Sequence, residues 1–295
     1  MPSSHQRKGT SVETSTSARR LFLIGSEASK AMSPDLWNPV LRKMTIGWSY
    51  EAWDVPAGAS MAEVRAKLLE TDVVAANVTM PHKQWAAGAG ETVTDPVRLS
   101  GAANLLVRHE KQLEAHNTDI TAVTALHGDR SERHAVMFGA GGAARATLVA
   151  LKDRVDHVSI ADRDSEASRQ LLELAARLGM DASETTWDGA QRQALRASLI
   201  VNATPLGKNR QDGPVWGMAG LADDAMVYDF VYAKHVTASI ASAKEQGLRY
   251  ADGWDHLREQ AAAMVPVLGL PPQTGLLLER TLATIHGGSA AVGPI

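Results

Sequence analysis

A lysine that follows a buried strand is the first residue in this chain that could do chemistry. The segment NVTMPHK, residues 77–83, comes directly after an apolar run at 73–76 that is typical of a buried strand. Asn77, Thr79 and Lys83 therefore bring an amide, a hydroxyl and an ammonium to the point where a strand leaves the core. Polar groups there must be hydrogen-bonded or used to bind a ligand. A plain turn would need the proline of this segment but not the lysine.

Other polar residues also stand at the ends of apolar segments. They are Ser33, Asn104, Asn117, Asp119 and Gln260. The ends of strands in open α/β sheets usually line a ligand crevice, so these side chains could converge on one bound molecule. Each also has a plain structural interpretation, as a helix cap, a turn former or a helix-face residue. Taken singly, none of them decides between a site and a structural role.

A glycine-rich turn at 138–145, FGAGGAAR, indicates a dinucleotide site. It has the G-x-G-x-x-A spacing and lies between an apolar strand and a helix. Such a turn lets backbone N–H groups approach a pyrophosphate at the helix N-terminus, although small-residue turns also serve plain strand–helix packing. Asp162 ends the next strand, close to the roughly 20-residue spacing of a ribose-binding acid. The cofactor contacts expected in the turn are Gly139, Gly141, Gly142, Ala143 and Ala144.

The residues after that next strand bear on the choice of cofactor. Asp162 can accept both ribose hydroxyls of NAD, whereas the 2′-phosphate of NADP would face two acids, Asp162 and Asp164. Arg163, between them, could instead stack on adenine or hold that phosphate. We therefore expect NAD or NADP as the cofactor, with NAD favoured.

The elements that must position these residues alternate between strands and helices, which predicts an α/β fold with crossover helices. Strands are expected at 21–25, 50–55, 72–78 and 157–162, strand-and-turn units at 197–207 and 225–232, and a hairpin over 104–117. Helices are expected at 34–42, 60–70, 165–178, 237–246, 254–268 and 275–286, and a strand, turn and helix over 134–151.

Composition narrows the class of protein. The chain has 295 residues, enough for two domains, and its 44% hydrophobic and 21% charged residues are typical of a soluble globular protein. A net charge of −3 argues against a general nucleic-acid or anionic-membrane binder. The chain has no cysteine, and its ten histidines form no ligand cluster, so no metal is expected. No apolar run approaches the roughly 20 residues of a membrane span and no signal-peptide pattern is present, so a cytoplasmic location is expected.

Taken in order, the motifs resemble the shikimate dehydrogenase family, from about Leu21 to Gln260 and beyond. NVTMPHK is similar to that family's N-V-T-x-P-aromatic-K, GAANLL to its G-A-x-N-T-L, and HNTDI to its N-T-D-G. GAGGAAR and VNATPLG resemble its cofactor-domain motifs, and DFVY with DGWDHLREQA resembles D-x-V-Y with G-x-x-M-L-x-x-Q-A. An ordered set of motifs is far more specific than one glycine turn.

The resemblance implies that Lys83 and Asp119 form a catalytic pair beside the carbon that exchanges hydride with a nicotinamide. An amine can take the proton of a secondary alcohol as hydride leaves, and a neighbouring carboxylate stabilises the charged lysine. The implied substrate contacts are Ser33, Thr79, Asn104, Tyr232 and Gln260. The expected cofactor contacts outside the glycine turn are Asp162, Arg163, Asn202, Thr204 and Gly253.

The resemblance also implies the domain organisation. An N-terminal α/β substrate domain is expected at 21–120, completed by C-terminal helices at about 255–290, with a Rossmann-type dinucleotide-binding domain at 121–254. Residues 1–20 are expected to form a disordered polar tail. The partner would be a small cyclic substrate, with no nucleic acid and no membrane, and a homodimer is an open alternative to a monomer.

Several positions depart from the family pattern. In the family's S-x-S-P segment two serine hydroxyls hold the substrate carboxylate, but here Ala31 replaces the first serine and only Ser33 remains. Lys30 stands where histidine is usual. The family's threonine after the amide, glycine after the carboxylate and methionine near the C-terminus are replaced by Leu105, Ile120 and His256. A hydroxyl lost from a carboxylate site costs about 1.5–3 kcal/mol if the bond is not replaced.

Either Lys30 compensates as a point charge and contacts the substrate, or the substrate differs. We expect a changed substrate, a cyclic hydroxy or keto compound related to shikimate or quinate. The alternatives are a true shikimate dehydrogenase, in which these departures have no functional effect, and a non-catalytic regulatory binder that retained the fold. The complete set of Lys83, Asp119 and Asn104 argues against the binder, and the missing hydroxyl argues for it.

Overall fold

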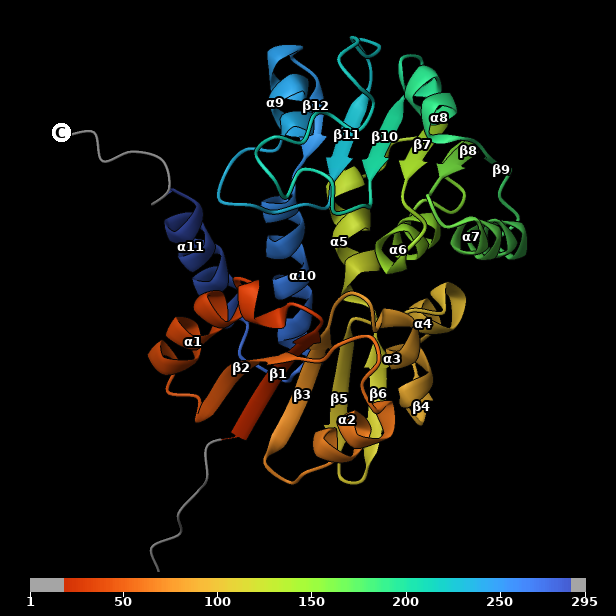
Figure 1. Ribbon diagram of the computed structural model, residues 1–295. Helices are drawn as coiled ribbons and strands as arrows, with labels where there is room; N and C mark the ends of the chain where they lie inside the picture. Colours follow the sequence, from red (N-terminus) through yellow and green to blue (C-terminus); the bar gives the residue numbers. More distant parts are fainter. Residues whose placement is uncertain (1–18, 288–295) are drawn as a thin grey trace, which may run out of the picture.

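The structure is a computed structural model that describes residues 19–287. It consists of two six-stranded sheets with helices packed on them, and the two sheets lie one above the other in Figure 1. The predicted α/β fold is therefore confirmed. The predicted tail falls outside the described residues except at Arg19 and Arg20, which already form the start of the first strand, so its predicted end is wrong by two residues.

The first sheet is mixed. Its strands are β1 (Arg19–Gly25), β2 (Trp48–Asp54), β3 (Val73–Val78), β4 (Thr92–Val93), β5 (Leu105–His109) and β6 (Gln112–His116), in the spatial order β2-β1-β3-β5-β6-β4. β1, β2 and β3 run parallel, and β5 is antiparallel to both β3 and β6. The β5–β6 pair confirms the predicted hairpin. Every residue of β3 is buried, as the apolar run at 73–76 predicts, and this includes the polar Asn77.

The second sheet is entirely parallel. Its strands are β7 (Glu132–Phe138), β8 (Val155–Ala161), β9 (Ala182–Glu184), β10 (Leu199–Asn202), β11 (Met226–Asp229) and β12 (Arg249–Ala251), in the order β12-β11-β10-β7-β8-β9. This is the 3-2-1-4-5-6 order of dinucleotide-binding folds, in which the ligand lies beyond the carboxyl ends of the strands where the order reverses. Here that switch point lies between β7 and β10.

Helices cover the sheets and connect them. They are η1 (Ala28–Lys30), α1 (Ser33–Lys43), α2 (Met61–Leu68), α3 (Lys83–Ala89), α4 (Asp95–Ser100), α5 (Thr118–His127), α6 (Gly142–Ala150), α7 (Ser165–Arg177), α8 (Trp187–Ala194), α9 (Ala238–Glu245), α10 (Gly253–Val267) and α11 (Gln273–Gly287). The sequence analysis did not predict α3, α4, α5 and α8. Among residues 19–287, no helix has both the length and the apolar character that a membrane crossing requires.

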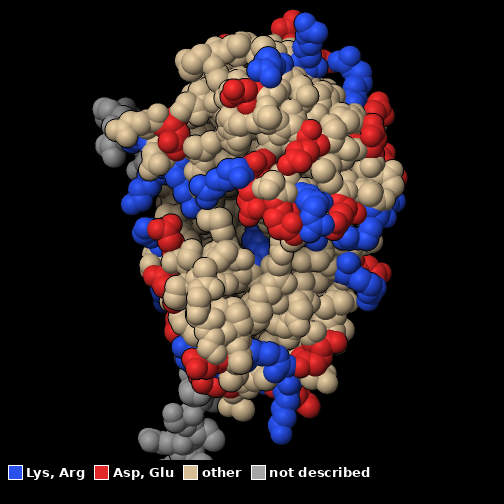
Figure 2. Space-filling view, turned by 45° about the vertical axis from the view of Figure 1, so that its right-hand side comes forward, with Lys and Arg blue, Asp and Glu red and all other residues tan. Residues whose placement is uncertain are grey.

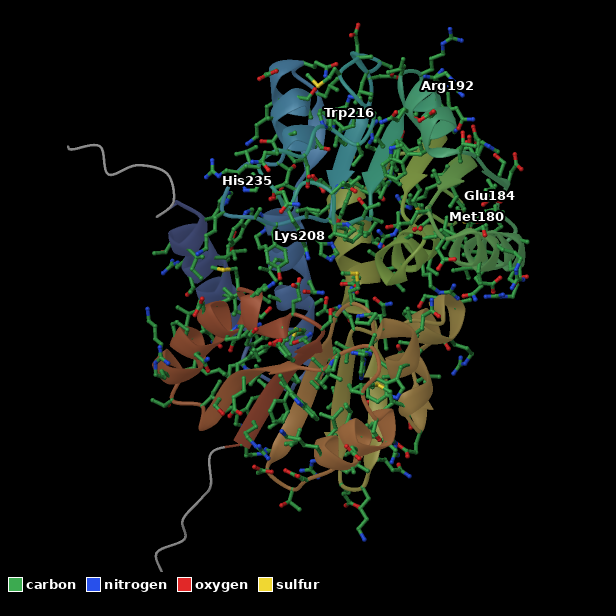
Figure 3. All side chains as sticks on the ribbon, viewed as in Figure 1. Met180, Glu184, Arg192, Lys208, Trp216 and His235 are labelled. Carbon is green, nitrogen blue, oxygen red and sulfur yellow. The ribbon has the colours of Figure 1, made fainter. Side chains whose placement is uncertain are left out.

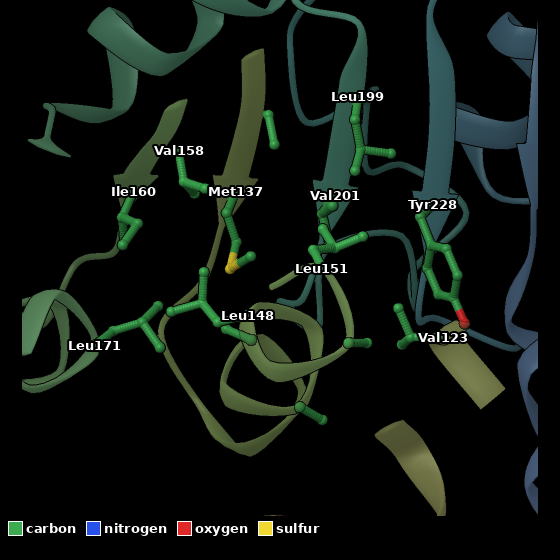
Figure 4. Packing of buried hydrophobic residues seen from close by; sticks show 14 of the residues in the cluster. Val123, Met137, Leu148, Leu151, Val158, Ile160, Leu171, Leu199, Val201 and Tyr228 are labelled. Atoms are coloured by element: carbon green, nitrogen blue, oxygen red, sulfur yellow. The ribbon is translucent and has the colours of Figure 1, made fainter. Parts of the chain in front are cut away.

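Two helices, α5 and α10, pack against each other between the sheets. α10 begins directly after β12, and its residues Leu257, Ala261 and Met264 join the hydrophobic core of the first sheet. α5 contributes Val123 to the core of the second sheet, which Figure 4 shows in close-up. The chain therefore returns to the first sheet after completing the second.

Candidate active site

Lys83 and Asp119 are in direct contact. Lys83 begins α3 and Asp119 lies in the first turn of α5, where the Asn117 side chain caps the helix. The Lys83 Nζ is 2.6 Å from the Asp119 Oδ2, and the Asp119 side chain is fully buried. The geometry thus brings together the two residues predicted as a catalytic pair, from helices separated in sequence by β4, α4, β5 and β6.

The other carboxylate oxygen of Asp119 receives three hydrogen bonds. The Asn104 Nδ2 donates to Oδ1 over 2.8 Å and the Gln260 Nε2 over 2.5 Å, and the His256 Nε2 lies 3.2 Å away. Burial alone would raise the pKa of Asp119, but the charge of Lys83 and the His256 contact outweigh it and hold that pKa well below its usual range. Asp119 is therefore a buried carboxylate that can only accept hydrogen bonds.

Asn104, predicted as a substrate contact, has its amide occupied by the protein. Its Nδ2 donates to Asp119 and to the Thr118 hydroxyl at 2.9 Å, and its Oδ1 accepts from the Thr118 backbone N–H at 2.8 Å. Both amide hydrogens and the amide oxygen thus have partners before any ligand binds. The structure therefore gives Asn104 the task of fixing α5 and the Asp119 carboxylate.

The polar residues of the NVTMPHK segment have different roles, since some bond or pack within the first sheet and one reaches the candidate active site. The Asn77 Oδ1 accepts a hydrogen bond from the Tyr50 hydroxyl at 2.6 Å, and its Nδ2 donates to the Asn104 carbonyl at 3.2 Å. Thr79 is half-buried, and its methyl group packs where a side chain at Gly25 would be. Of the three, only Lys83 reaches Asp119 and the start of α6, which gives the lysine of this segment a role that a turn alone would not need.

Ser33 and Tyr232 lie close to Tyr50, beside this network. Ser33 is buried at the start of α1, near enough to the Tyr50 hydroxyl to lower the pKa of Tyr50 against the effect of burial. Burial raises the pKa of Tyr50, and Tyr232 is near enough to raise it further. Burial also raises the pKa of Tyr232, so both phenols keep their protons at neutral pH. Among these hydroxyl groups, that of Tyr50 bonds the amide of Asn77 directly.

Lys30 lies apart from the pair. Its side chain is 72% exposed, and its ammonium bonds the carboxylate of Glu27. The hydrogen bond from Lys30 lowers the pKa of Glu27, with a further contribution from the charge of Lys208 on the loop after β10. Figure 3 labels Lys208 at the side of the second sheet that faces the first. The partner of Lys30 in the structure is thus Glu27, and its contact with the substrate stays a prediction.

The replacements Leu105 and Ile120 are packing residues. Leu105 is fully buried in the core of the first sheet, and Ile120 is 8% exposed in the core of the second. Ala31 is half-buried and packs against the same core as Leu105. The missing serine hydroxyl at position 31 is thus replaced by a methyl group in contact with apolar side chains.

The glycine turn has the form that a pyrophosphate needs. Gly139 has φ +102°, and a Cβ there would lie 2.8 Å from the Ala203 carbonyl oxygen. Gly141 caps the N-terminus of α6, and a Cβ on it would meet no atom within 4 Å. There is thus open space beside Gly141 at the N-terminus of α6, where the first N–H groups of a helix have no partner within the helix. Gly142, Ala143 and Ala144 form the first turn of that helix.

Asp162 supports the same turn. Its Oδ2 accepts from the Ala140 N–H at 2.7 Å and its Oδ1 from the Asp164 N–H at 2.9 Å. Each oxygen keeps a lone pair for a ribose hydroxyl. Asp164 caps α7, and Arg163 between them is exposed. The structure therefore leaves all three residues at the end of β8 available for the adenosine half of a cofactor.

Three other predicted cofactor contacts have structural partners of their own. The Asn202 Oδ1 accepts from the backbone and the hydroxyl of Thr204, at 3.1 and 2.6 Å. The Asn202 Nδ2 donates to the Leu206 carbonyl and to Asp229, each at 2.8 Å. A Cβ at Gly253 would lie 2.4 Å from the Tyr232 backbone nitrogen, so this glycine is required for close packing. Asn202 and Thr204 thus shape the loop after β10 with their side chains, which leaves its backbone for a cofactor.

Lys83 also touches the glycine turn. A Cβ at Gly142 would lie 2.9 Å from the Lys83 Cδ, so the lysine's methylene groups pass directly beside the start of α6. Figure 2 shows a hollow on this face of the molecule, between the two halves, with Lys or Arg atoms inside it. The proton-transfer candidate and the dinucleotide-binding candidate are therefore adjacent.

The sequence analysis missed two features of this site. It did not name Tyr228, and it named His256 only as a replacement, without predicting its contact with Asp119. The Tyr228 hydroxyl lies 2.8 Å from the His256 Nδ1, and the opposite ring nitrogen contacts Asp119. The signal for His256 was present, because an ionisable side chain replaces an apolar one in a motif. Tyr228 gave no signal, since it reads as an ordinary strand residue.

Comparison with known proteins agrees with this geometry. The family described as shikimate dehydrogenase substrate binding domain matches residues 23–106. A shikimate dehydrogenase (NADP(+)) of Rhodopseudomonas palustris is 35% identical over 250 residues, which cover 82% of this chain and 88% of that protein. The chain belongs to the shikimate dehydrogenase family. Membership confirms the predicted family and the predicted enzyme class, an NAD(P)-dependent oxidoreductase that acts on a CH–OH group.

Solved structures of this family have the same architecture. The shikimate dehydrogenase of Mycobacterium tuberculosis superimposes with a TM-score of 0.74 at 26% identity, over 90% of this chain and 99% of that one. A quinate dehydrogenase of Corynebacterium glutamicum, solved in complex with NAD, gives a TM-score of 0.78 at 21% identity, over 90% and 99%. The second likeness concerns the fold alone.

Proposed function

We propose that this protein interconverts a cyclic secondary alcohol and its ketone, with Lys83 as the proton-transfer group and Asp119 as its partner. The observation that carries the proposal is the position of Lys83, which contacts a fully buried carboxylate at 2.6 Å and passes beside Gly142 of the dinucleotide turn. Hydride transfer and proton transfer must occur at one carbon and its oxygen, so the two groups must be adjacent.

In the oxidation direction, the hydroxyl proton moves to the Lys83 Nζ while the C–H bond breaks. The bound nicotinamide supplies the hydride acceptor in oxidation and the hydride donor in reduction. In reduction, the Lys83 ammonium donates its proton to the developing alkoxide. Asp119 stabilises that ammonium, and its own bonds to Asn104 and Gln260 keep the carboxylate from turning away.

For the cofactor, we propose NAD with NADP as the alternative. Asp162 and Asp164 place two carboxylates beside the expected ribose, against the single cation of Arg163. A 2′-phosphate there would meet two like charges. The alternative is supported by the relatives, since the Rhodopseudomonas palustris enzyme is named for NADP(+).

For the substrate, we propose a ring compound related to shikimate or quinate, with shikimate itself a poor substrate. The support is Ala31, a methyl group where the family pattern has a hydroxyl, together with Lys30, whose ammonium bonds Glu27. The second candidate is an ordinary shikimate dehydrogenase, which the names of the relatives favour. A non-catalytic binder has less support. The fold alone does not require a buried carboxylate paired with a lysine, so the pair favours a catalytic role.

Steady-state turnover on shikimate, quinate and related cyclic alcohols lacking the carboxylate, each with NAD and NADP, tests the proposal. We expect measurable oxidation of at least one ring alcohol, and a kcat/KM for shikimate that rises roughly 10-fold in Ala31→Ser. Efficient oxidation of shikimate by the wild type, falling sharply in Lys30→Ala, would overturn the substrate assignment. No turnover of any ring alcohol would overturn the enzymatic one.

A further inference from the structure

His256 is buried between the two halves, and both of its ring nitrogens are occupied. The ring is 7% exposed and lies on α10, one turn before Gln260. Its Nδ1 is 2.8 Å from the Tyr228 hydroxyl oxygen and its Nε2 is 3.2 Å from the Asp119 Oδ1. The Phe230 ring packs against it with a centroid separation of 4.6 Å. The imidazole therefore has one fixed orientation.

The two hydrogen-bond partners of His256 determine which of its ring nitrogens carries a hydrogen. Asp119 is an ionised carboxylate and can only accept, so the His256 Nε2 must carry the hydrogen that it shares with Asp119. Burial raises the pKa of Tyr228 well above its usual range, and the charges of Asp119, Asp255 and Glu259 raise it further. Tyr228 thus keeps its hydroxyl hydrogen and can donate it to Nδ1. Figure 4 shows the Tyr228 hydroxyl at the margin of the apolar cluster, beyond its ring.

These contacts form one chain of hydrogen bonds that runs from Tyr228 through His256 and Asp119 to Lys83. Resting on the proposed function, we propose that His256 is a positioning residue for the proton transfer, acting through Asp119. The Nε2–H bond holds Oδ1, which leaves Oδ2 aimed at the Lys83 ammonium. It also takes up part of the carboxylate's negative charge, so less of that charge acts on Lys83.

The charged and titratable groups around His256 come from four elements. Asp119 faces it from α5, Tyr228 from β11, and Asp255 and Glu259 lie on its own helix, α10, while Lys83 of α3 is one bond further along. In the proposed mechanism, Lys83 is the one group among these five that gains and loses a proton in every turnover. A change at His256 should therefore be read out in the pH dependence of Lys83.

The test compares His256→Met with His256→Gln. Methionine fills the space beside Phe230 but cannot donate, whereas glutamine can place an amide N–H near the position of Nε2–H. We expect kcat to fall about 10-fold in His256→Met with KM little changed, and to be largely restored in His256→Gln. In oxidation, which needs the neutral amine, the acidic limb of the kcat profile should move to higher pH by roughly half a unit or more in His256→Met.

Two further variants separate positioning from packing. Tyr228→Phe removes one hydroxyl and should shift the profile in the same direction by a smaller amount, because the imidazole then loses one of its two anchors. His109→Met, on an exposed strand residue, should change neither kcat nor the profile. Equal losses of kcat in His256→Met and His256→Gln, with an unshifted pH profile, would assign His256 to packing and overturn the proposal.

A measurement without substrate keeps this inference separate from the proposed function. The rate at which acetic anhydride acetylates Lys83, followed by mass spectrometry across pH, reports the fraction of neutral amine directly. We expect the acetylation profile of His256→Met to move to higher pH relative to the wild type, and that of His256→Gln to coincide with the wild type. If all three profiles coincide, the inference about His256 is wrong, whether or not a substrate has been found. If the wild type turns over no ring alcohol but the profiles differ, only the proposed function fails.

Discussion

Lys83 and Gly142 come from opposite halves of the molecule and lie so close together that a side chain at position 142 would meet the lysine. A Cβ at position 142 would lie 2.9 Å from the Lys83 Cδ and 3.0 Å from its Cβ. The first residue of α6 therefore lies directly beside the methylene groups of Lys83, the proposed proton-transfer residue.

Gly142→Ala should displace Lys83 without unfolding the protein. Gly142 has a helical backbone, so alanine suits the conformation, but its methyl group must push the lysine's methylene groups aside. We expect kcat to fall roughly 10-fold, because a shift of about 1 Å in a reacting group is costly. The control is Gly88→Ala on α3, where a Cβ meets nothing within 4 Å. It should keep full activity, and equal behaviour of the two variants would rule out the contact.

Lys83→Ala should abolish proton transfer and leave the cofactor site intact. We expect turnover to fall roughly 10²–10⁴-fold, with the dissociation constant of the cofactor nearly unchanged in a fluorescence titration. The free energy of unfolding should also fall, because the buried Asp119 carboxylate loses its cation. Lys152→Ala, on an exposed lysine, is the control. A near-normal kcat in Lys83→Ala would show that another group moves the proton.

Asp162→Asn should improve the use of NADP relative to NAD. The substitution removes one of the two negative charges that would face a 2′-phosphate. It also replaces one acceptor of a backbone N–H, so a small loss of stability is expected. Asp164→Asn is the matched comparison, since asparagine also caps helices well and only the charge changes. The ratio of kcat/KM for the two cofactors measures both, and a strong NADP preference in the wild type would contradict the assignment.

Asp229 should make the protein less stable as the pH rises through about 6. Burial raises the pKa of Asp229 to about 6, against the bonds from Thr237, Val231 and Asn202, which lower it. The folded state therefore binds a proton that the unfolded state releases above the ordinary pKa of 3.8. The stability from this proton is complete below pH 3.8 and lost as the pH passes about 6, and the difference corresponds to about 3 kcal/mol.

Denaturant unfolding of wild type and Asp229→Asn between pH 4 and 8 measures this term. We expect the stability of Asp229→Asn relative to the wild type to increase over that range and to level off above about pH 7. Asp224→Asn, on an exposed acid, should give a constant difference. A wild-type advantage that grows with pH would mean that Asp229 is better solvated or better paired than its burial indicates.

Sequence reasoning predicted β3, the β5–β6 hairpin and the strand–turn–helix of the dinucleotide site, because unbroken apolar runs and glycine spacing are local signals. It missed α5, whose sequence TDITAVTALH is rich in β-branched residues. The Asn117 cap and the packing against α10 decide that this segment is helical. Tertiary contacts of this kind are not local, so no pattern within the segment could reveal them.

For the site, too, local motifs could be predicted from the sequence but contacts between distant segments could not. The motif order brought Lys83 and Asp119 together correctly, but their partners depended on the fold. The sequence predicted Asn104 as a substrate contact, which stays a prediction, but it gave no sign that the Asn104 amide bonds Thr118 and Asp119. His256 could be recognised as unusual, but its partner Asp119 lies 137 positions earlier, a distance that only the fold closes.

Because α10 packs against α5, the contacts around Asp119 join residues that are synthesised at very different times. A ribosome makes Asp119 141 residues before the Gln260 that bonds it, with the whole second sheet translated in between. Until α10 emerges, the nascent chain holds an acidic side chain with two of its hydrogen-bond donors still unmade. Asp119 therefore gains its full set of partners only after the second sheet has been made, and a chain that ends before α10 would carry the lysine, the acid and the dinucleotide turn without the His256 and Gln260 contacts to the carboxylate.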